Sequence, residues 1–192
     1  MAKLTITRAD FFASIQDMGR QRTQHLGLAQ SGVADDYSFF RANYLVGNAV
    51  TTPVIEIITG FFSITTDSPV TMALTGADMS ARVNNAPLSP WQSFVLMPGK
   101  VLELKNTAGM GIYSYLAVKG GFDIPLCFKS ASTVVRENLG GYHGRTLAAG
   151  DVLATILPRP LGPTLATPAD QIPQFDRPLR LRIMPGYDHD NF

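Results

Sequence analysis

The sequence predicts a mainly β protein, built as a barrel or a sandwich. Short runs rich in β-branched, aromatic and apolar residues dominate the chain. Turn signals such as Asn84-Asn85 and Pro98-Gly99 separate these runs, and a single segment with helical periodicity interrupts them. Short strands spaced by turns are typical of barrels and sandwiches, and they argue against alternating β-α units.

The first predicted strand covers residues 3–7, where Leu4 and Ile6 alternate with threonines. Further strands are predicted at 54–58, 61–65, 70–75, 93–97, 101–104, 112–118 and 152–156. A single main helix is predicted at about 36–46, with Asp35 or Asp36 able to cap its positive N-terminal end. The apolar face of this helix is expected to consist of Tyr37, Phe40, Tyr44 and Leu45.

The composition changes after residue 156. Six of the thirteen prolines lie at 158, 160, 163, 168, 173 and 178. Because proline cannot donate to a strand ladder, residues 157–178 are predicted to form an extended linker that packs little core of its own. Residues 179–183 alternate as a half-exposed strand. We therefore expect a β domain at 1–156, a Pro-rich linker at 157–178 and a further element from 179 to 192.

Composition excludes several classes of function. Sixteen Lys and Arg against fifteen Asp and Glu leave a charge of +1, and no basic run indicates nucleic-acid binding. The single Cys127 excludes an internal disulfide framework and fits a reducing, cytoplasmic compartment. The N-terminus lacks the apolar stretch of a secretory signal, and no window approaches the ~20 apolar residues of a membrane span.

A glycine-punctuated polar stretch at 16–35 is the strongest candidate for function. Arg20 offers a planar donor fork for a carboxylate or phosphate, and His25 can act as acid, base or donor. Asp17 and Asp35 are candidate substrate contacts, although Asp is also common in turns and caps. The alternative is a surface loop in which Arg20 only pairs with Asp17 or Glu56.

Other candidates lie at predicted strand ends and in later glycine-rich turns. Asp78 follows a strand and is a candidate for proton transfer, as is His25. Lys119 precedes Gly120 and Gly121, a place where a strand end opens onto a cleft. Arg145 ends the stretch 139–145, whose backbone N–H groups could hold an anion, although a tight structural loop explains this stretch equally well.

Glu56, within an apolar strand, needs a partner, which Arg20 or Arg145 could supply. The histidines at 25, 143 and 189 are too far apart in sequence to predict a metal site. We expect Arg20, His25 and Asp35 to line one polar cleft with Lys119 or Asp78.

The ordered set of motifs resembles the biotin-dependent carboxyltransferase family. That family includes the C subunit of 5-oxoprolinase, allophanate hydrolase subunit 2, part of urea carboxylase and the antagonist of a sporulation-kinase inhibitor. The run QDMGRQRTQHLGLAQSGVADDYSFFRANYLVGN looks like the opening of this family. The later matching segments are VIEIITG, TGAD at 75–78, WQSF at 91–94, YLAVKGGFD at 115–123, Ser132-Thr133, Gly140-Gly141, Gly144-Arg145 and Gly150-Asp151.

The resemblance implies a cyclophilin-like β-barrel and a role within a hydrolase complex. It implies a component like the C subunit of an ATP-dependent 5-oxoprolinase, which opens 5-oxo-L-proline to L-glutamate with partners like the A and B subunits. Arg20, Lys119, Arg145 and the glycine loops would then stabilise an oxyanion, with Asp78 and His25 handling protons. Asp17, Asp35, Gly120 and Gly121 would contact the amide or ureido substrate.

The resemblance also leaves alternatives open. One is a component of a urea- or allophanate-type carboxyltransferase, and another is a non-catalytic protein-binding regulator. No Met-Lys-Met of the type that carries biotin is present, so carboxybiotin would be delivered by a partner. Family members usually continue into a second barrel half, which would begin near residue 179. The isolated chain is therefore expected to be inactive.

Overall fold

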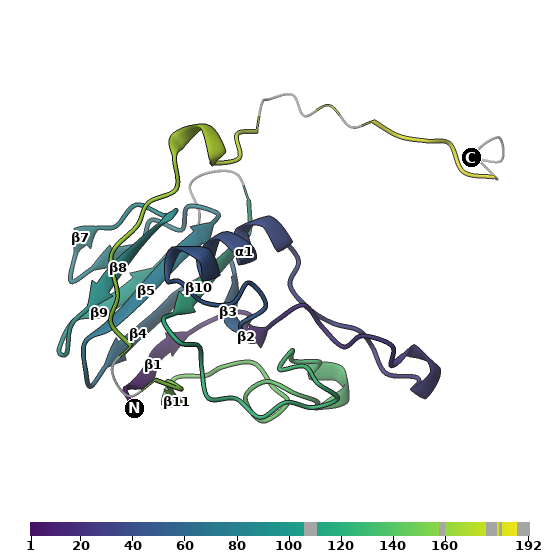
Figure 1. The fold of residues 1–192 in the computed structure, drawn as a ribbon, viewed down its shortest axis with the longest axis horizontal. Helices are drawn as coiled ribbons and strands as arrows, with labels where there is room; N and C mark the ends of the chain where they lie inside the picture. The colour runs from purple at the N-terminus through teal and green to yellow at the C-terminus, as the bar shows by residue number, and fades with distance from the viewer. Residues whose placement is uncertain (106–110, 158–159, 176–179, 181, 188–192) are drawn as a thin grey trace.

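Two antiparallel β-sheets, packed face to face, form the body of the protein in its computed structural model (Figure 1). The structure describes residues 1–105, 111–157, 160–175, 180 and 182–187. The first sheet has the strand order β11-β1-β4-β9-β6-β7, and the second has the order β2-β3-β10-β5-β8. The strands are β1 (Lys3–Ala9), β2 (Ala13–Gln16), β3 (Val54–Ile58), β4 (Phe62–Thr66), β5 (Val70–Gly76), β6 (Arg82–Val83), β7 (Ala86–Pro87), β8 (Gln92–Leu96), β9 (Val101–Leu104), β10 (Tyr113–Val118) and β11 (Val152–Ala154).

The main core lies between the sheets. Alternation along β1 places Leu4 and Ile6 in this core, and Ile55 and Ile57 of β3 enter it from the other sheet. Residues 70–75 of β5 are buried throughout because the helix α1 (Asp36–Leu45) covers the second face of their sheet. A continuous apolar strand such as β5 is therefore explained by burial on both faces.

Helix α1 confirms the predicted segment, but only half of its predicted apolar face, since Leu45 is buried and Phe40 packs half-buried against the same cluster. The side chains that pack against the sheet are those of Phe39, Ala42 and Leu45. Tyr37 and Tyr44 are exposed instead, and the Arg41 guanidinium lies over both rings, 5.6 and 5.7 Å from their centroids. The Arg41 guanidinium thus contacts both tyrosine rings on the solvent side of the helix. On the opposite side, the small Ala42 side chain lets the helix pack closely on the sheet.

The mainly β class is confirmed, and every predicted strand before residue 157 is present to within two residues. The strands β2, β6 and β7 were not predicted. In the described part of the chain the recorded strand pairs form two sheets, so closure into a cyclophilin-like barrel stays a prediction. Three short 3-10 helices complete the described structure, at Gln24–Leu26, Val135–Glu137 and Ala169–Gln171.

The Pro-rich segment follows the edge of β8 (Figure 1). The backbone groups of Ser93 and Leu165 are joined by a hydrogen bond of 2.8 Å, and the Thr167 N–H donates to Trp91 O at 2.8 Å. The segment is therefore extended, as predicted, yet its residues 160–167 are bonded to the sheet. Residues 158–159 and 176–178 of the predicted linker, and positions 179 and 181 of the predicted strand, lie outside the described residues.

No helix in the described ranges is both long and apolar enough to cross a membrane. The long connection from β10 to β11 packs back on β2. There the N–H groups of Thr133 and Leu147 donate to Ile15 O and Ala13 O. These contacts bring the segment 130–147 beside the predicted functional stretch at 16–35.

Candidate functional site

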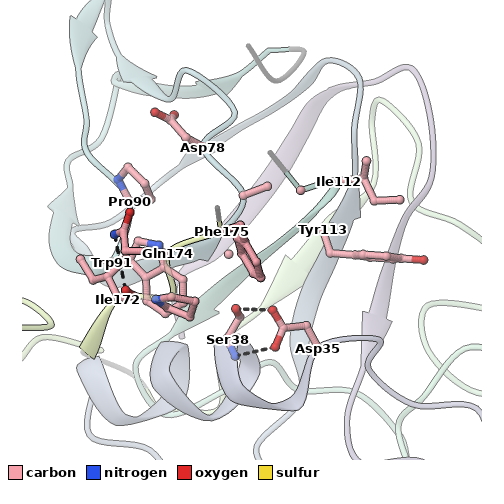
Figure 2. A pocket seen from close by; sticks show the side chains of 14 residues that line it. Asp35, Ser38, Asp78, Pro90, Trp91, Ile112, Tyr113, Ile172, Gln174 and Phe175 are labelled. Carbon is pink, nitrogen blue, oxygen red and sulfur yellow. Dashed lines mark hydrogen bonds between the residues drawn. The ribbon is translucent and has the colours of Figure 1, made fainter. Parts of the chain in front are cut away.

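A cavity of about 540 Å³ lies where the N-terminus of α1 meets one end of the second sheet (Figure 2). We call it the α1 cavity. The end of β5 and the starts of β8 and β10 meet there because these three strands are antiparallel neighbours. Its lining residues are Asp35, Ser38, Gly76, Ala77, Asp78, Pro90, Trp91, Gly111, Ile112, Tyr113, Ile172, Pro173, Gln174 and Phe175.

Asp35 is the N-cap of α1 and stands in the wall of this cavity. Its Oδ1 accepts a hydrogen bond from the Ser38 N–H at 3.0 Å, and the Ser38 hydroxyl donates to Oδ2 at 2.5 Å (Figure 2). A carboxylate at this position satisfies a free N–H of the first turn and suits the positive end of the helix dipole. The cap therefore fixes an anionic group at the cavity.

Behind Asp35, a buried network ties the start of the helix to the sheet. The Tyr115 hydroxyl donates to Glu56 Oε2 at 2.9 Å and accepts from the Asp35 N–H at 2.8 Å. The Ala34 N–H also donates to Glu56 Oε2, at 2.8 Å. Glu56 and Tyr115 are directly opposite in the β3–β10 register, so the sheet itself places the two side chains together.

Burial controls the protonation of this network. Burial raises the pKa of Glu56 above its usual value, the hydrogen bonds from Ala34 and Tyr115 offset part of this rise, and the charge of Asp35 adds to it. Burial, followed by the charge of Glu56, raises the pKa of Tyr115. The expectation that Arg20 or Arg145 pairs with Glu56 is wrong, because neutral donors occupy its oxygen instead.

Asp78 stands on the side of the α1 cavity opposite Asp35 (Figure 2). It follows β5, and its Oδ1 accepts from the Ser80 N–H at 2.8 Å. This local bond is the turn interaction that short acidic side chains favour. The carboxylate is exposed, so it remains open to a ligand.

Aromatic and apolar side chains form much of the remaining wall. Trp91 is the only tryptophan of the chain. Its backbone N–H donates to Leu74 O at 2.6 Å, and its ring lies 6.1 Å from that of Tyr37. Residues 172–175 close the cavity from the C-terminal side. The preceding residue, Gln171, holds them there through two bonds to α1. The Tyr37 hydroxyl donates to Gln171 O at 2.5 Å, and the Arg41 guanidinium donates to Gln171 Oε1.

Arg20 does not reach this cavity. Its side chain is fully buried, and its Nη2 donates to Ser132 O at 2.6 Å. The Nε and Nη1 atoms are buried without a hydrogen-bond partner among the described residues. The expected ion pair with Asp17 or Glu56 is therefore wrong. Gly140 lies directly against the guanidinium: a Cβ at this residue would stand 2.2 Å from Nη2.

Asp17 is engaged inside the protein. Its Oδ1 accepts from the hydroxyls of Ser130 and Ser132, at 2.7 and 2.6 Å, and from the Gly19 N–H at 2.8 Å. Its Oδ2 accepts from the Ala131 N–H at 2.6 Å. These bonds fasten the stretch 16–35 to the segment 130–132. The observed bonds of Asp17 are thus those of a structural anchor.

Lys119 lies at the opposite end of the sheet from Asp78, since Val118 pairs with Met72 and Ser114 with Gly76. Its Nζ donates to Val46 O at 3.0 Å. Gly120 and Gly121 follow with φ of 81° and 80°, and the Gly120 N–H donates to Asn48 Oδ1 at 2.7 Å. This corner therefore closes the C-terminal end of α1 on the sheet.

Arg145 and His25 occupy separate places. The Arg145 guanidinium binds both Asp151 oxygens, at 2.7 and 2.8 Å, and this pairing raises the pKa of Arg145 and lowers that of Asp151. His25 is exposed in the 3-10 helix Gln24–Leu26. The structure thus brings Asp35 and Asp78 to one cavity and does not bring Arg20, His25, Lys119 or Arg145 to it.

Residues 139–144 of the glycine-rich stretch line another cavity, of about 660 Å³, together with Cys127 and β11. The N–H groups of Gly141 and Gly144 already donate to Ala131 O and Gly140 O. These bonds favour the alternative of a tight structural loop over an anion cradle. Among the described residues no group of three or more His, Cys, Asp or Glu side chains is placed to hold a metal ion.

Sequence reasoning did not identify Trp91, Tyr113 or Phe175 as cavity residues. Trp91 follows a proline directly before a strand, which is a local signal for a strand end. Phe175 gave no signal, because its place beside Asp35 depends on the path of the segment 160–175.

The comparisons with known proteins point to one family. The carboxyltransferase domain, subdomain A and B, matches residues 26–192. The chain is 34% identical over 192 residues to the 5-oxoprolinase C subunit of Escherichia coli, covering 98% of this chain and 59% of that protein. It is also 34% identical over 191 residues to a putative urea carboxylase of Emericella nidulans, covering 98% of this chain and 15% of that protein.

Its fold is similar to the crystal structure of TTHA0988, with a TM-score of 0.87 at 33% identity over 98% of this chain and 37% of the other. The chain spans about half the length of the bacterial relatives it matches. Because the family pattern covers most of the sequence, the chain belongs to the carboxyltransferase domain family, subdomains A and B.

Proposed function

We propose that the chain acts as the counterpart of the C subunit in an ATP-dependent 5-oxoprolinase, which opens 5-oxo-L-proline to L-glutamate together with partner proteins. The observation that carries this proposal is the 34% identity to the 5-oxoprolinase C subunit of Escherichia coli across 98% of this chain. The relative's name describes one member of an assembly, so the proposal includes partners like the A and B subunits.

The distribution of cations supports a role that depends on these partners. Opening an amide requires donors that converge on a developing oxyanion. Arg20, Lys119 and Arg145 are instead each bonded internally, to Ser132 O, Val46 O and Asp151. The described residues thus do not assemble a phosphate or oxyanion site from these cations. The proposal leaves ATP to the partner proteins and expects the isolated chain to be inactive.

The positions of Asp78 and His25, the two residues predicted to transfer protons, also support a role that depends on partner proteins. Asp78 lies at the α1 cavity, whereas His25 is exposed on the stretch 16–35. A general acid or base must lie within hydrogen-bond reach of the proton it transfers. In the proposed assembly, partner proteins supply the further groups that a catalytic site with either residue needs.

Reconstitution tests the proposal. The purified chain is mixed with the A and B subunits of a 5-oxoprolinase, and glutamate formation from 5-oxo-L-proline is measured with and without ATP. We expect ATP-dependent glutamate release from the complete mixture and none from the chain alone. Glutamate release by the chain alone, or an undiminished rate when the chain is omitted, would contradict the proposal.

A second function is favoured by the equal identity, 34%, to the putative urea carboxylase of Emericella nidulans. In this case the chain would work in a urea- or allophanate-type carboxyltransferase, with carboxybiotin delivered by a partner protein. The assay uses a partner loaded with carboxybiotin and measures urea-dependent loss of the carboxyl group. Loss that depends on the chain supports this function, and glutamate release without such loss supports the first.

A further inference from the structure

We propose that the α1 cavity binds an organic cation, an alkylammonium or guanidinium group, with Asp35 and Asp78 as its counter-charges. This inference goes beyond the proposed reaction, whose substrates are not cations, and it stands on the chain alone. It follows from the charge of the cavity, the position of the carboxylates and the nature of the walls between them.

The described lining of the cavity is acidic. Its described lining contains two carboxylates, Asp35 and Asp78, and no Lys, Arg or His. Glu56 lies directly behind Asp35, and the proximity of these two groups contributes to the raised pKa of Glu56. The ion pairs between described residues are Arg8–Asp10, Arg136–Glu137 and Arg145–Asp151, so none of them neutralises these groups. A concave site with one sign of charge concentrates ligands of the opposite sign.

Both carboxylates can still accept hydrogen bonds. A carboxylate offers about four acceptor positions. Two are used at Asp35, by the N–H and hydroxyl of Ser38, and one at Asp78, by the Ser80 N–H. An ammonium or guanidinium group carries three or more donors, so it matches acceptors that the described residues leave open.

The geometry favours an extended organic cation over a metal ion. Figure 2 shows Asp35 and Asp78 on opposite sides of the cavity, whereas a metal ion needs several ligands around one point. Trp91, Pro90 and Phe175 supply apolar wall between the carboxylates. An alkyl stem can pack on this wall while its charged head bonds a carboxylate, and aromatic faces add attraction for a cation.

The same cation chemistry has two sources, a free small molecule or a Lys or Arg side chain of a partner protein. Trp91 allows both to be tested, because it is the only tryptophan and lines the cavity. The chain is titrated with n-butylammonium and n-butylguanidinium, and with butyrate and n-butanol as anionic and neutral analogues, at constant ionic strength. We expect a saturable change in Trp91 fluorescence with the cations and none with butyrate or butanol.

Matched variants assign the effect to the cavity. D35N and D78N remove one charge each, and asparagine at the N-cap preserves the helix cap. Each should raise the Kd for the cation about fivefold, as loss of one partly exposed ion pair predicts. D36N is the control, because Asp36 lies next in sequence and does not line the cavity. Its Kd should stay that of the parent. If D35N fails to fold, the exposed D78N provides the same comparison.

The proposal is overturned by the absence of a saturable response to either cation, by an equal response to butanol, or by D36N weakening binding as much as D78N. A second titration identifies the source of the cation. Short peptides with one central Lys or Arg are compared with the same peptide carrying norleucine. Tighter binding of the Lys or Arg peptide than of the free cations identifies a partner side chain, and the reverse identifies a small molecule. Equal binding of the norleucine peptide also overturns the proposal.

Discussion

Glu56 and Tyr115 share a buried hydrogen bond of 2.9 Å beneath the N-terminus of α1. Through the Asp35 N–H, which donates to the Tyr115 hydroxyl, this pair also fixes the residue whose carboxylate enters the α1 cavity. The pair therefore connects the stability of the fold to the geometry of the cavity, and both consequences can be measured.

We expect Tyr115→Phe to lower the free energy of unfolding by about 1–3 kcal/mol, because it leaves the Asp35 N–H and a Glu56 oxygen buried without this partner. Urea denaturation measures the change. Tyr113→Phe is the matched control, since Tyr113 lies on the same strand and is only half-buried. Equal losses for the two variants would show that the hydroxyl of Tyr115 has no special role.

The second prediction concerns pH. The pKa of Glu56 is raised in the folded protein above its ordinary value of 4.5, so between these two values the folded state binds more protons than the unfolded state. The free energy of unfolding therefore falls as the pH rises through this window, and the contribution is lost above the folded pKa. Glu56→Gln removes this dependence.

The measurement compares unfolding free energies of the parent and Glu56→Gln from about pH 4 to about pH 8, a range that begins near the ordinary value of a glutamate and extends well above it. The free energy of unfolding of the parent should fall relative to that of the variant as the pH rises. Other carboxyls, such as Asp151 with its lowered pKa, are present in both proteins, so their contributions cancel in the difference. Glu103→Gln controls for the exchange of a carboxyl for an amide on another strand. A constant difference between the parent and Glu56→Gln would contradict the prediction.

Arg20→Ala should lower the free energy of unfolding by about 2–4 kcal/mol, because it opens a space in a fully buried site and removes the bond to Ser132 O. Arg20→Met should lose less, since it keeps most of the volume and buries no cation. Chemical denaturation distinguishes the two. Retention of the parent stability by Arg20→Ala would contradict the buried, structural position of this residue and restore it as a site candidate.

The fourth prediction addresses the segment along β8. Ser93 Oγ accepts from the Leu165 N–H at 2.7 Å. Ser93→Ala should therefore speed hydrogen exchange at Leu165 about tenfold, which corresponds to one lost hydrogen bond. Ser89→Ala, on the exposed loop before β8, is the control. Exchange of Leu165 at the rate of an unstructured amide in the parent would show that the segment does not pair with the sheet.

Most of the fold could be predicted because strands and turns have local signals. Asn84-Asn85, a predicted turn, joins β6 to β7 with φ of 47° and 69°, values that asparagine tolerates. The strand Ala13–Gln16 was missed because all four residues are buried, which removes the contrast between alternate positions.

The candidate site was only partly predictable. Asp35 and Asp78 were found because caps and turns are local. The partner of Glu56 was missed, since Tyr115 lies 59 residues away and strand register decides which side chains meet. Arg20 was predicted to be available because arginine is usually exposed, yet the segment 130–132 buries it.

The attachment of residues 165–167 along β8 also bears on solubility. In the five-stranded sheet β8 is a terminal strand, and an uncovered terminal strand invites pairing with a strand of another molecule. Residues 165–167 cover part of that edge, and the flanking Pro163 and Pro168 have no N–H group to offer a further strand. A chain truncated before residue 160 should therefore self-associate through β8 even if its core remains intact.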